Sequence, residues 1–174
     1  AAVVTEYTAL DPLRQWTDHL TDVAPVIEID TDCLVPLTLV DGKPTSASQF
    51  RKKTKHERQA RLASCWPDTD VGESELPELP FEPIDDRELD IPTLIEKCDI
   101  DHQVKPVLDT PGGSQAGYDR WESFKAHGLD RYKWDRNDPA KPEAVSRMSA
   151  YLHFGHVSVF RLAREADSHD GRGV

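Results

Sequence analysis

The first 30 residues carry two short apolar runs separated by a stretch with helical spacing. Residues 1–7 and 26–29 have the continuous apolar character of buried strands. The helical spacing between them is carried by Leu13, Trp16, Leu20 and Val23, and Asp11-Pro12 precedes it as a helix start. A strand, a helix and a strand in about 30 residues predict a βαβ unit with a parallel sheet. We expect Trp16 to lie in its core.

The next segments lead away from this unit. An apolar run at 33–40 ends at the turn Asp41-Gly42, and residues 45–64 predict a helix with Ser46 or Ser48 near its start. Residues 67–92 are rich in Asp and Glu and are interrupted by prolines at 67, 77, 80, 83 and 92. Since proline blocks helices and sheet ladders and like charges repel, this segment predicts an extended linker between two domains. An ordered loop wrapped over a surface is the alternative.

After residue 101 the pattern turns helical. One stripe, made by Ala116, Tyr118, Trp121 and Phe124, predicts a helix that Ser114 caps and Gly128 ends. A polar stretch at 130–141 follows, and Pro142 suits the first turn of a helix with an apolar face that Gly155 stops. Ser158 is the expected cap of a last helix at 159–166. The order of elements therefore predicts α/β followed by all-α.

Charge is concentrated in the middle of the chain. The 21 Lys and Arg and 32 Asp and Glu give a formal net charge of −11. Residues 68–101 alone carry a net −11, whereas the parts before and after are close to neutral. The acidity therefore does not exclude a nucleic-acid partner for the two ends. Residues 51–61 are locally basic, which favours a solvated helix face over a patch that contacts phosphates.

Several classes of protein are disfavoured by composition. No apolar run approaches the ~20 residues of a membrane span, so no membrane partner is expected, and no signal-peptide pattern is visible. Cys33, Cys65 and Cys98 fit neither a disulfide ladder nor a CxxC site, which predicts free thiols in a reducing, intracellular compartment. His153 and His156 have a spacing that can bind a metal, but without neighbouring ligands they are expected to pack, and no metal site is predicted.

One short segment combines groups that suit an anion. Val145-Ser146-Arg147-Met148-Ser149 places two hydroxyls and a guanidinium near a predicted helix start, where free N–H groups and the helix dipole favour a phosphate. Plain helix capping by the serines is the alternative. Tyr132 offers a flat face and a phenol earlier in the chain, although a tyrosine in this context is often a half-buried packing residue.

The same residues carry a resemblance to a known family. Tyr132, Asp138-Pro139 and the run from Ser146 to Ser158 resemble the photolyase/cryptochrome family, and residues 136–141 look most like the class II branch of the cyclobutane pyrimidine dimer photolyases. The front of the chain is similar to the second half of that branch's N-terminal α/β domain. The matching stretches there are 3–5, 13–16, 26–30 and 34–36. Residues 101–106 and 111–113 look like its inter-domain region.

This resemblance implies an organisation and a cofactor. Residues 1–66 would be the C-terminal part of a Rossmann-like parallel-sheet domain, 67–101 an acidic, proline-rich linker, and 102–174 the start of a helical FAD-binding domain that continues beyond this piece. By the resemblance, Tyr132 approaches the FAD. The loop that holds its pyrophosphate and ribityl end comprises Val145, Ser146, Arg147, Met148 and Ser149. Arg147 departs from the asparagine usual in class II, and Met148 from the usual leucine.

The implied activity is that of a deoxyribodipyrimidine photolyase, of which this chain would be a fragment without activity of its own. Members of the family split cyclobutane pyrimidine dimers in UV-damaged DNA by light-driven electron donation from reduced FAD. A cryptochrome-like blue-light photoreceptor without repair activity, or an inactive truncated product, are the alternatives. The resemblance predicts no catalytic residue within this chain, and it leaves the antenna pigment and the oligomeric state unknown.

Overall fold

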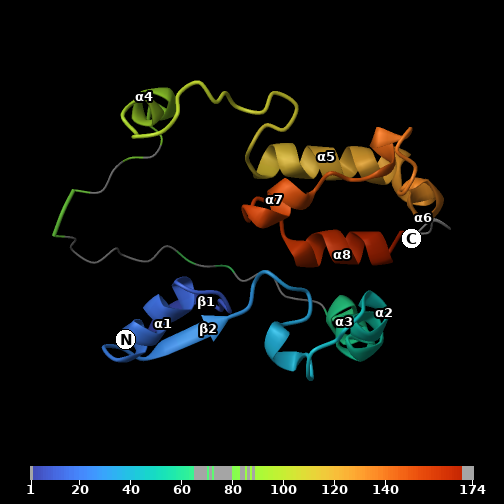
Figure 1. Cartoon of the computed structure of the whole chain (residues 1–174), viewed down its shortest axis with the longest axis horizontal. Coiled ribbons are helices and arrows are strands. Elements are labelled where there is room, and N and C mark those ends of the chain that lie inside the picture. The colour runs from blue at the N-terminus through green and yellow to red at the C-terminus, as the bar shows by residue number, and fades with distance from the viewer. Residues whose placement is uncertain are drawn as a thin grey trace. The chain divides into compact units, whose positions relative to one another are not determined.

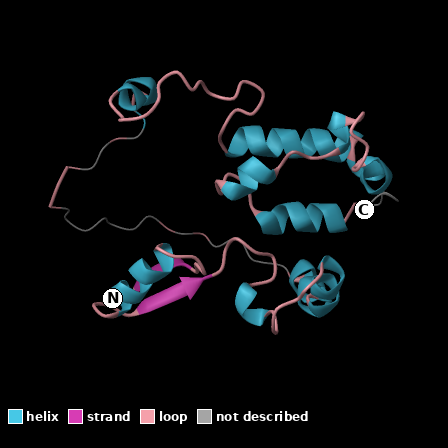
Figure 2. Cartoon of the chain, in the orientation of Figure 1, coloured by secondary structure: helices cyan, strands magenta, loops and turns pink. Residues whose placement is uncertain are grey.

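The computed structural model describes residues 2–64 and 89–169, together with residues 70, 72, 80–82, 85 and 87. By its contacts the chain forms two units, one made of residues 1–65 and 112–174 and the other of residues 66–111. Among the residues that the structure describes, strand occurs only before residue 30, and helices dominate the remainder (Figure 2). The predicted order of α/β followed by helices is confirmed at this level.

The predicted βαβ unit is present. Strand β1 (Val3–Glu6) pairs in parallel with β2 (Val26–Ile29), in the register Val3 to Val26, and helix α1 (Leu13–Thr21) connects them (Figure 1). Alternate strand residues are half-buried and exposed, as expected when one face of a sheet is covered. The Arg14 guanidinium of α1 joins Glu28 of β2 at 2.6 Å, so an ion pair ties the helix to the sheet.

The core predicted for this unit is not closed. Between residues 2 and 64 the buried side chains are Thr17 and Thr54, and the expected core residue Trp16 is 63% exposed. That prediction was wrong because two strands offer too little surface to cover a helix on all its apolar positions. Trp16 instead lines a pocket of about 360 Å³ with Leu13, Leu20 and the residues that follow β1.

The predicted helix at 45–64 is divided into α2 (Ala47–Lys53) and α3 (Lys55–Ala63). Ser46 caps α2 as expected, because its hydroxyl accepts from the Gln49 N–H at 3.3 Å. The division falls at Thr54, whose buried hydroxyl donates to the Phe50 carbonyl at 2.9 Å. A threonine that bonds back to the preceding turn bends a helix, which explains the interruption. Before α2, the apolar run at 33–40 contains a 3-10 turn, η1 (Leu37–Leu39).

Helix α4 (Ile91–Glu96) begins at the end of the segment predicted to be extended, residues 67–92, and lies within the linker predicted over 67–101. Asp90 caps it through the Thr93 N–H, and Pro92 stands in its first turn, where a missing N–H costs nothing. This proline therefore begins a helix instead of interrupting an extended segment. Most of the remaining linker prediction, including Pro67, Pro77 and Pro83, lies outside the described residues, and the domain boundaries at 66/67 and 101/102 stay predictions.

The buried apolar side chains of the described residues lie between 121 and 162. They come from α5 (Ser114–His127), α7 (Ser149–His153), α8 (Val159–Asp167) and the turns between these helices. The cluster consists of Trp121, Phe124, Leu129, Met148, Tyr151, Val157 and Leu162, and we call it the helical core. Ala116 and Tyr118 pack against it, which confirms the stripe predicted on α5.

The ends of these helices follow the sequence with one exception. Gly128 is the C-cap of α5, Gly155 ends the α7 segment at φ +67°, and Ser158 caps α8 by accepting from the Arg161 N–H. The exception is Ser114. It is the first residue of α5, and Gly113, at φ +99°, occupies the N-cap position. The Ser114 side chain therefore makes no capping hydrogen bond.

The helix predicted to run from Pro142 to Gly155 is broken. A 3-10 turn, η4 (Pro142–Ala144), precedes a non-helical loop over Val145–Met148, and α7 begins only at Ser149. Arg147 in this loop has φ +54°, a left-handed conformation that no α-helix continues through. The polar stretch before it contains two further short elements, η3 (Leu129–Arg131) and α6 (Tyr132–Asp135).

Candidate functional site

The loop Val145–Ser149 is anchored by one side chain. Met148 is only 4% exposed and belongs to the helical core, whereas Val145, Arg147 and Ser149 lie at the surface and Ser146 is half-buried. The left-handed Arg147 reverses the backbone just before Met148. Burial of one thioether side chain thus fixes a loop whose polar side chains remain accessible.

Tyr132 lies on α6 and packs against the same helical core. Its ring meets the Phe124 ring edge-on, with centroids 6.0 Å apart, and the Arg136 guanidinium lies 5.5 Å from its centroid. Tyr132 and Met148, two of the predicted site residues, are therefore placed against one cluster although 15 positions separate them in sequence. The other predicted residues flank Met148 in the loop, where Val145, Arg147 and Ser149 are exposed and Ser146 is half-buried.

The chemical groups of this loop suit an anionic phosphate. Ser146 and Ser149 supply two hydroxyls, and Arg147 carries a fixed positive charge. The loop also leads into the start of α7, and the first backbone N–H groups of a helix have no carbonyl partner within that helix. The arrangement can bind and orient a phosphate ester, and it holds no acid–base pair that would suggest bond-breaking chemistry.

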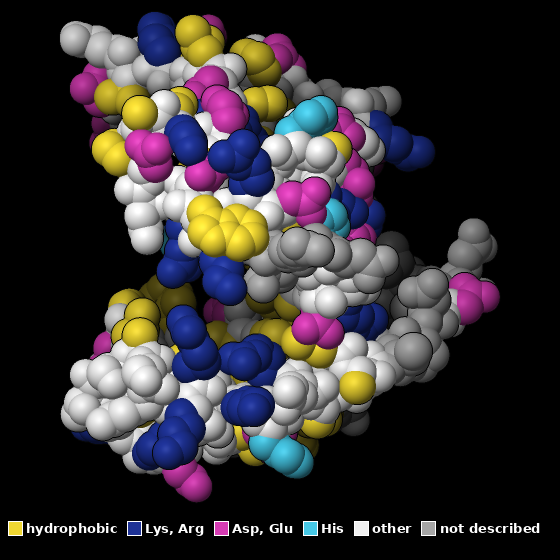
Figure 3. All heavy atoms as spheres, turned by 90° about the vertical axis from the view of Figure 1, so that its right-hand side faces the viewer, with side chains coloured by type: hydrophobic (Ala, Val, Ile, Leu, Met, Phe, Trp, Pro, Cys, Tyr) yellow, Lys and Arg dark blue, Asp and Glu magenta, His cyan; other side chains and the backbone are white. Residues whose placement is uncertain are grey.

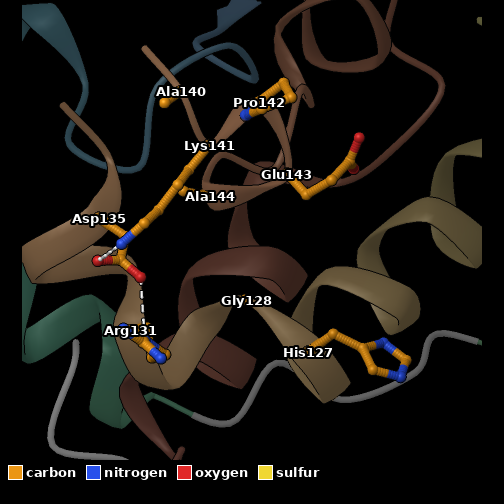
Figure 4. A pocket seen from close by; sticks show the side chains of 9 residues that line it. All are labelled: His127, Gly128, Arg131, Asp135, Ala140, Lys141, Pro142, Glu143 and Ala144. Carbon is orange, nitrogen blue, oxygen red and sulfur yellow. Dashed lines mark hydrogen bonds and ion pairs between the residues drawn. The ribbon is translucent and has the colours of Figure 1, made fainter. Parts of the chain in front are cut away.

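A pocket of about 410 Å³ lies beside α6 and was not predicted from the sequence. Its lining side chains come from the end of α5, from α6 and from residues 140–144. Figure 4 shows the side chains of Arg131 and Lys141 converging on Asp135, with His127 and Glu143 on the other side of the pocket. Lys141 Nζ lies 2.8 Å from Asp135 Oδ1, and Arg131 Nε lies 2.9 Å from Oδ2.

Asp135 is the centre of this arrangement. The hydrogen bond from Lys141 lowers its pKa; partial burial opposes this effect, and the charge of Arg131 adds to it. The carboxylate is therefore charged well below neutral pH, and both of its oxygens are occupied. The sequence contained one local signal for it, the i, i+4 spacing of Arg131 and Asp135. The bond to Lys141 depends on the path of the loop, which no spacing rule predicts.

A second carboxylate ties together the helices below the loop. Glu165 of α8 accepts from Trp121 Nε1 and Lys125 Nζ of α5, both at 2.6 Å, and from Arg161 Nε at 2.8 Å. Partial burial alone would raise the pKa of Glu165. The hydrogen bonds from Lys125, Arg161 and Trp121 outweigh burial and lower this pKa to about 2. The pairing of α5 with α8 thus rests on a charge as well as on apolar contacts.

His153 and His156 belong to an aromatic group rather than a metal site. The His153 ring lies 4.8 Å from the exposed Phe154 ring, and the His156 ring contacts both Phe154 and Tyr151. Within the described ranges, no group of three His, Cys, Asp or Glu side chains could hold a metal ion. The packing role predicted for the two histidines agrees with these contacts.

Basic side chains gather on the surface over α2 and α3, in the lower part of the view in Figure 3. Arg51, Lys52, Lys53 and Lys55 are exposed there. Lys53 Nζ donates to the Asp41 carbonyl at 2.5 Å, so one of these side chains also serves the fold. In the helices of residues 2–64 and 89–169, no helix is long and apolar enough to cross a membrane.

Comparison with known proteins gives a consistent result. The chain is 31% identical to a deoxyribodipyrimidine photo-lyase of Oryza sativa subsp. japonica over 95% of its own length and 34% of the rice protein. It is 26% identical to one from Potorous tridactylus and 27% identical to one from Methanothermobacter thermautotrophicus, again over 95% or more of this chain. No family model matches. The chain spans about a third of the length of these relatives, and the resemblance to photolyases is confirmed.

Proposed function

We propose, from this likeness to deoxyribodipyrimidine photo-lyases, that the chain is part of a light-driven enzyme that repairs UV-damaged DNA. One observation carries the proposal: the similarity runs through nearly the whole chain and includes both the βαβ unit and the loop at Val145–Ser149. The substrate would be DNA that contains cyclobutane pyrimidine dimers, and the reaction would split the cyclobutane ring. The assignment to the class II branch is part of this proposal.

We further propose FAD as the cofactor. The residues present fit its phosphate end, since one short loop before α7 carries the Ser146 and Ser149 hydroxyls and the Arg147 guanidinium, and Arg147 and Ser149 are exposed. Tyr132 would contribute the edge of an aromatic wall next to this loop. When bound, the reduced flavin supplies the electron on absorbing light. This chain's part is to bind and orient the phosphates.

The proposed organisation follows from these assignments. Residues 1–66 would complete a Rossmann-like sheet, which the parallel pair β1 and β2 supports. Residues 102–174 would begin the helical domain that encloses the flavin, which the helical core around Met148 supports. The linker between them would cover 67–101, with α4 inside it.

The test uses the full-length protein that contains this chain. After desalting, we expect flavin absorbance at about 450 nm that corresponds to roughly one flavin per chain. We also expect light-dependent repair of a thymine-dimer oligonucleotide. A protein purified without flavin would contradict the FAD assignment. Bound flavin with no repair under light would contradict the repair function and favour the photoreceptor.

The loop assignment has its own variant. Ser146→Ala combined with Ser149→Ala removes both hydroxyls and should weaken flavin retention, because each lost hydrogen bond is worth roughly 0.5–1.5 kcal/mol. The matched control is Ser123→Ala, which removes an exposed hydroxyl from α5. Equal flavin content in the double variant and in the control would rule out the loop as the phosphate site.

A further inference from the structure

One carboxylate, that of Asp135, lies between the two parts of the proposed flavin site, Tyr132 and the loop Val145–Ser149. Tyr132 lies three residues before Asp135 on α6, and the loop Val145–Ser149 follows directly after the segment 140–144. Asp135 shares α6 with Tyr132, and it accepts a hydrogen bond at 2.8 Å from Lys141, which belongs to the segment leading into the loop. This bond therefore helps to set the position of the loop relative to Tyr132.

The backbone around Asp135 makes the connection stiff. The Asp138 N–H donates to the Asp135 carbonyl at 2.9 Å, and the Lys141 N–H donates to the Asp138 carbonyl at 3.1 Å. The Asp138 carboxylate accepts from the Ala140 N–H at 3.0 Å. The Ala144 N–H then donates to the Lys141 carbonyl at 3.0 Å. An unbroken series of hydrogen bonds thus leads from Asp135 to the residue before Val145.

Close packing fixes the same segment against α5. A Cβ built on Gly128 would lie 2.6 Å from the Phe124 ring and 3.3 Å from the Glu143 carbonyl oxygen, so only glycine allows this approach. Phe124 is also the ring that Tyr132 contacts edge-on. The segment that leads into the loop and Tyr132 therefore both pack near the Phe124 ring, and the ion pair of Lys141 with Asp135 holds the same segment to α6 (Figure 4).

We propose that Asp135 is a positioning residue for the phosphate end of the cofactor, setting the place of the Val145–Ser149 loop relative to Tyr132 through Lys141 and Arg131. This inference rests on the proposed function. Asp135 touches neither Tyr132's ring nor the serine hydroxyls in this arrangement, so it acts through the elements that carry them. The pocket beside α6 is lined by the same three side chains, Arg131, Asp135 and Lys141.

The test compares Asp135→Asn with Asp130→Asn in the full-length protein. Asp130 stands on the neighbouring turn, is 69% exposed and pairs only with His169 among the described side chains, so its variant makes the same chemical change outside the network. We expect Asp135→Asn to bind FAD at least tenfold more weakly and to alter the visible circular dichroism of the flavin that remains bound. Asp130→Asn should match wild type in both. Asp135→Glu keeps the negative charge, so its affinity for FAD should lie closer to that of wild type than to that of Asp135→Asn.

A second variant covers the case in which Asp135→Asn does not fold. Lys141→Gln removes the ion pair with Asp135 and the longer one with Asp138 at 3.7 Å, but it keeps the pairing of Arg131 with Asp135, so folding should be retained. We expect a threefold to tenfold loss of FAD affinity together with the same change in flavin circular dichroism. A role in folding alone would lower the folded fraction but leave the dichroism of bound flavin unchanged.

Two outcomes separate the inference from the proposed function. If wild-type protein carries no flavin, the proposed function fails. If wild-type protein carries flavin and Lys141→Gln binds it with wild-type affinity and dichroism, the positioning role of Asp135 is overturned while the FAD assignment stands.

Discussion

At the scale of single residues, Glu165 carries more of the fold than its place on a surface helix suggests. Its two carboxylate oxygens accept hydrogen bonds from the Trp121 indole, the Lys125 ammonium and the Arg161 guanidinium. Since its pKa is about 2 in the folded chain against 4.5 ordinarily, its charge stabilises the fold at neutral pH by at most about 3 kcal/mol. This contribution is complete above pH 4.5 and is lost as the pH falls towards 2.

We therefore predict that Glu165→Gln lowers the free energy of unfolding by about 1–3 kcal/mol at pH 7, because the donors lose a charged acceptor. Urea unfolding followed by tryptophan fluorescence measures it. The difference from wild type should shrink as the pH falls from about 4.5 to about 2. Glu122→Gln is the control, because Glu122 is 56% exposed and its loss should cost under about 0.5 kcal/mol. A difference that did not depend on pH would contradict the assignment of the charge.

The close packing of Val157 and Tyr151 against α5 requires a glycine at position 117. A Cβ at this position would lie 2.6 Å from Val157 Cγ1 and 2.9 Å from Tyr151 Cδ1, and Tyr151 is 1% exposed and cannot move aside. Alanine favours a helix by about 1 kcal/mol over glycine, whereas overpacking a core costs about 1–3 kcal/mol.

We predict that Gly117→Ala lowers the free energy of unfolding by about 1–2 kcal/mol, since overpacking outweighs helix propensity. Thermal unfolding followed by circular dichroism measures it. Gly112→Ala is the control, because the nearest atom to its added Cβ is His156 Nε2 at 3.8 Å. A stabilised Gly117→Ala variant would show that α5 and the Val157 turn are packed less closely than described.

At the scale of elements, two of the serines expected to cap helices, Ser114 and Ser158, differ in role. The Ser158 hydroxyl accepts a hydrogen bond from the Arg161 N–H. The backbone N–H of Ser158 donates to the Tyr118 hydroxyl at 3.1 Å. We predict that Ser158→Ala costs about 1 kcal/mol of unfolding free energy through loss of the cap. Ser114→Ala should change it by less than about 0.5 kcal/mol, because Gly113 is the N-cap of α5. Chemical denaturation compares the two, and equal losses would contradict the capping assignments.

Local chemistry accounts for what the sequence could predict at this scale. The βαβ unit, the cap at Ser46 and the stop at Gly155 were predicted because each depends on residues close in sequence. The division at Thr54 and the loop before α7 were missed. The first arises from the hydrogen bond of the Thr54 hydroxyl and the second from the left-handed backbone at Arg147, and the spacing of apolar residues is the same with an unbroken helix. Trp16 was misplaced because burial depends on neighbouring strands, not on the helix that carries it.

The candidate site divides in the same way. The groups suited to a phosphate were visible in the run Val145–Ser149, and the resemblance supplied Tyr132. That Tyr132 and Met148 pack on one cluster could not be predicted, because it requires the turns at 129–144 to bring them together. The network around Asp135 was missed for the same reason: Lys141 reaches it only through the loop.

At the scale of the whole molecule, the loop at Val145–Ser149 would form only one side of the proposed flavin site. The pocket next to it ends at Ala144, and the side chains of Val145, Arg147 and Ser149 are exposed. An FAD placed on this surface would leave its ring systems in water. Burial of such apolar faces supplies affinity at ~25 cal/mol per Å², and closed pockets bury most of a ligand's surface.

The last prediction follows from this comparison of energies. Hydrogen bonds from the two serines and from backbone N–H groups are worth roughly 0.5–1.5 kcal/mol each, whereas immobilising a ligand costs about 4–15 kcal/mol. We therefore predict that the isolated 174-residue chain does not retain FAD, whereas the full-length protein does. Flavin absorbance after desalting of each protein measures this, with circular dichroism confirming that the isolated chain is helical. Stoichiometric flavin on the isolated chain would mean that its own residues enclose the cofactor, and the open loop described here would then have to close around it.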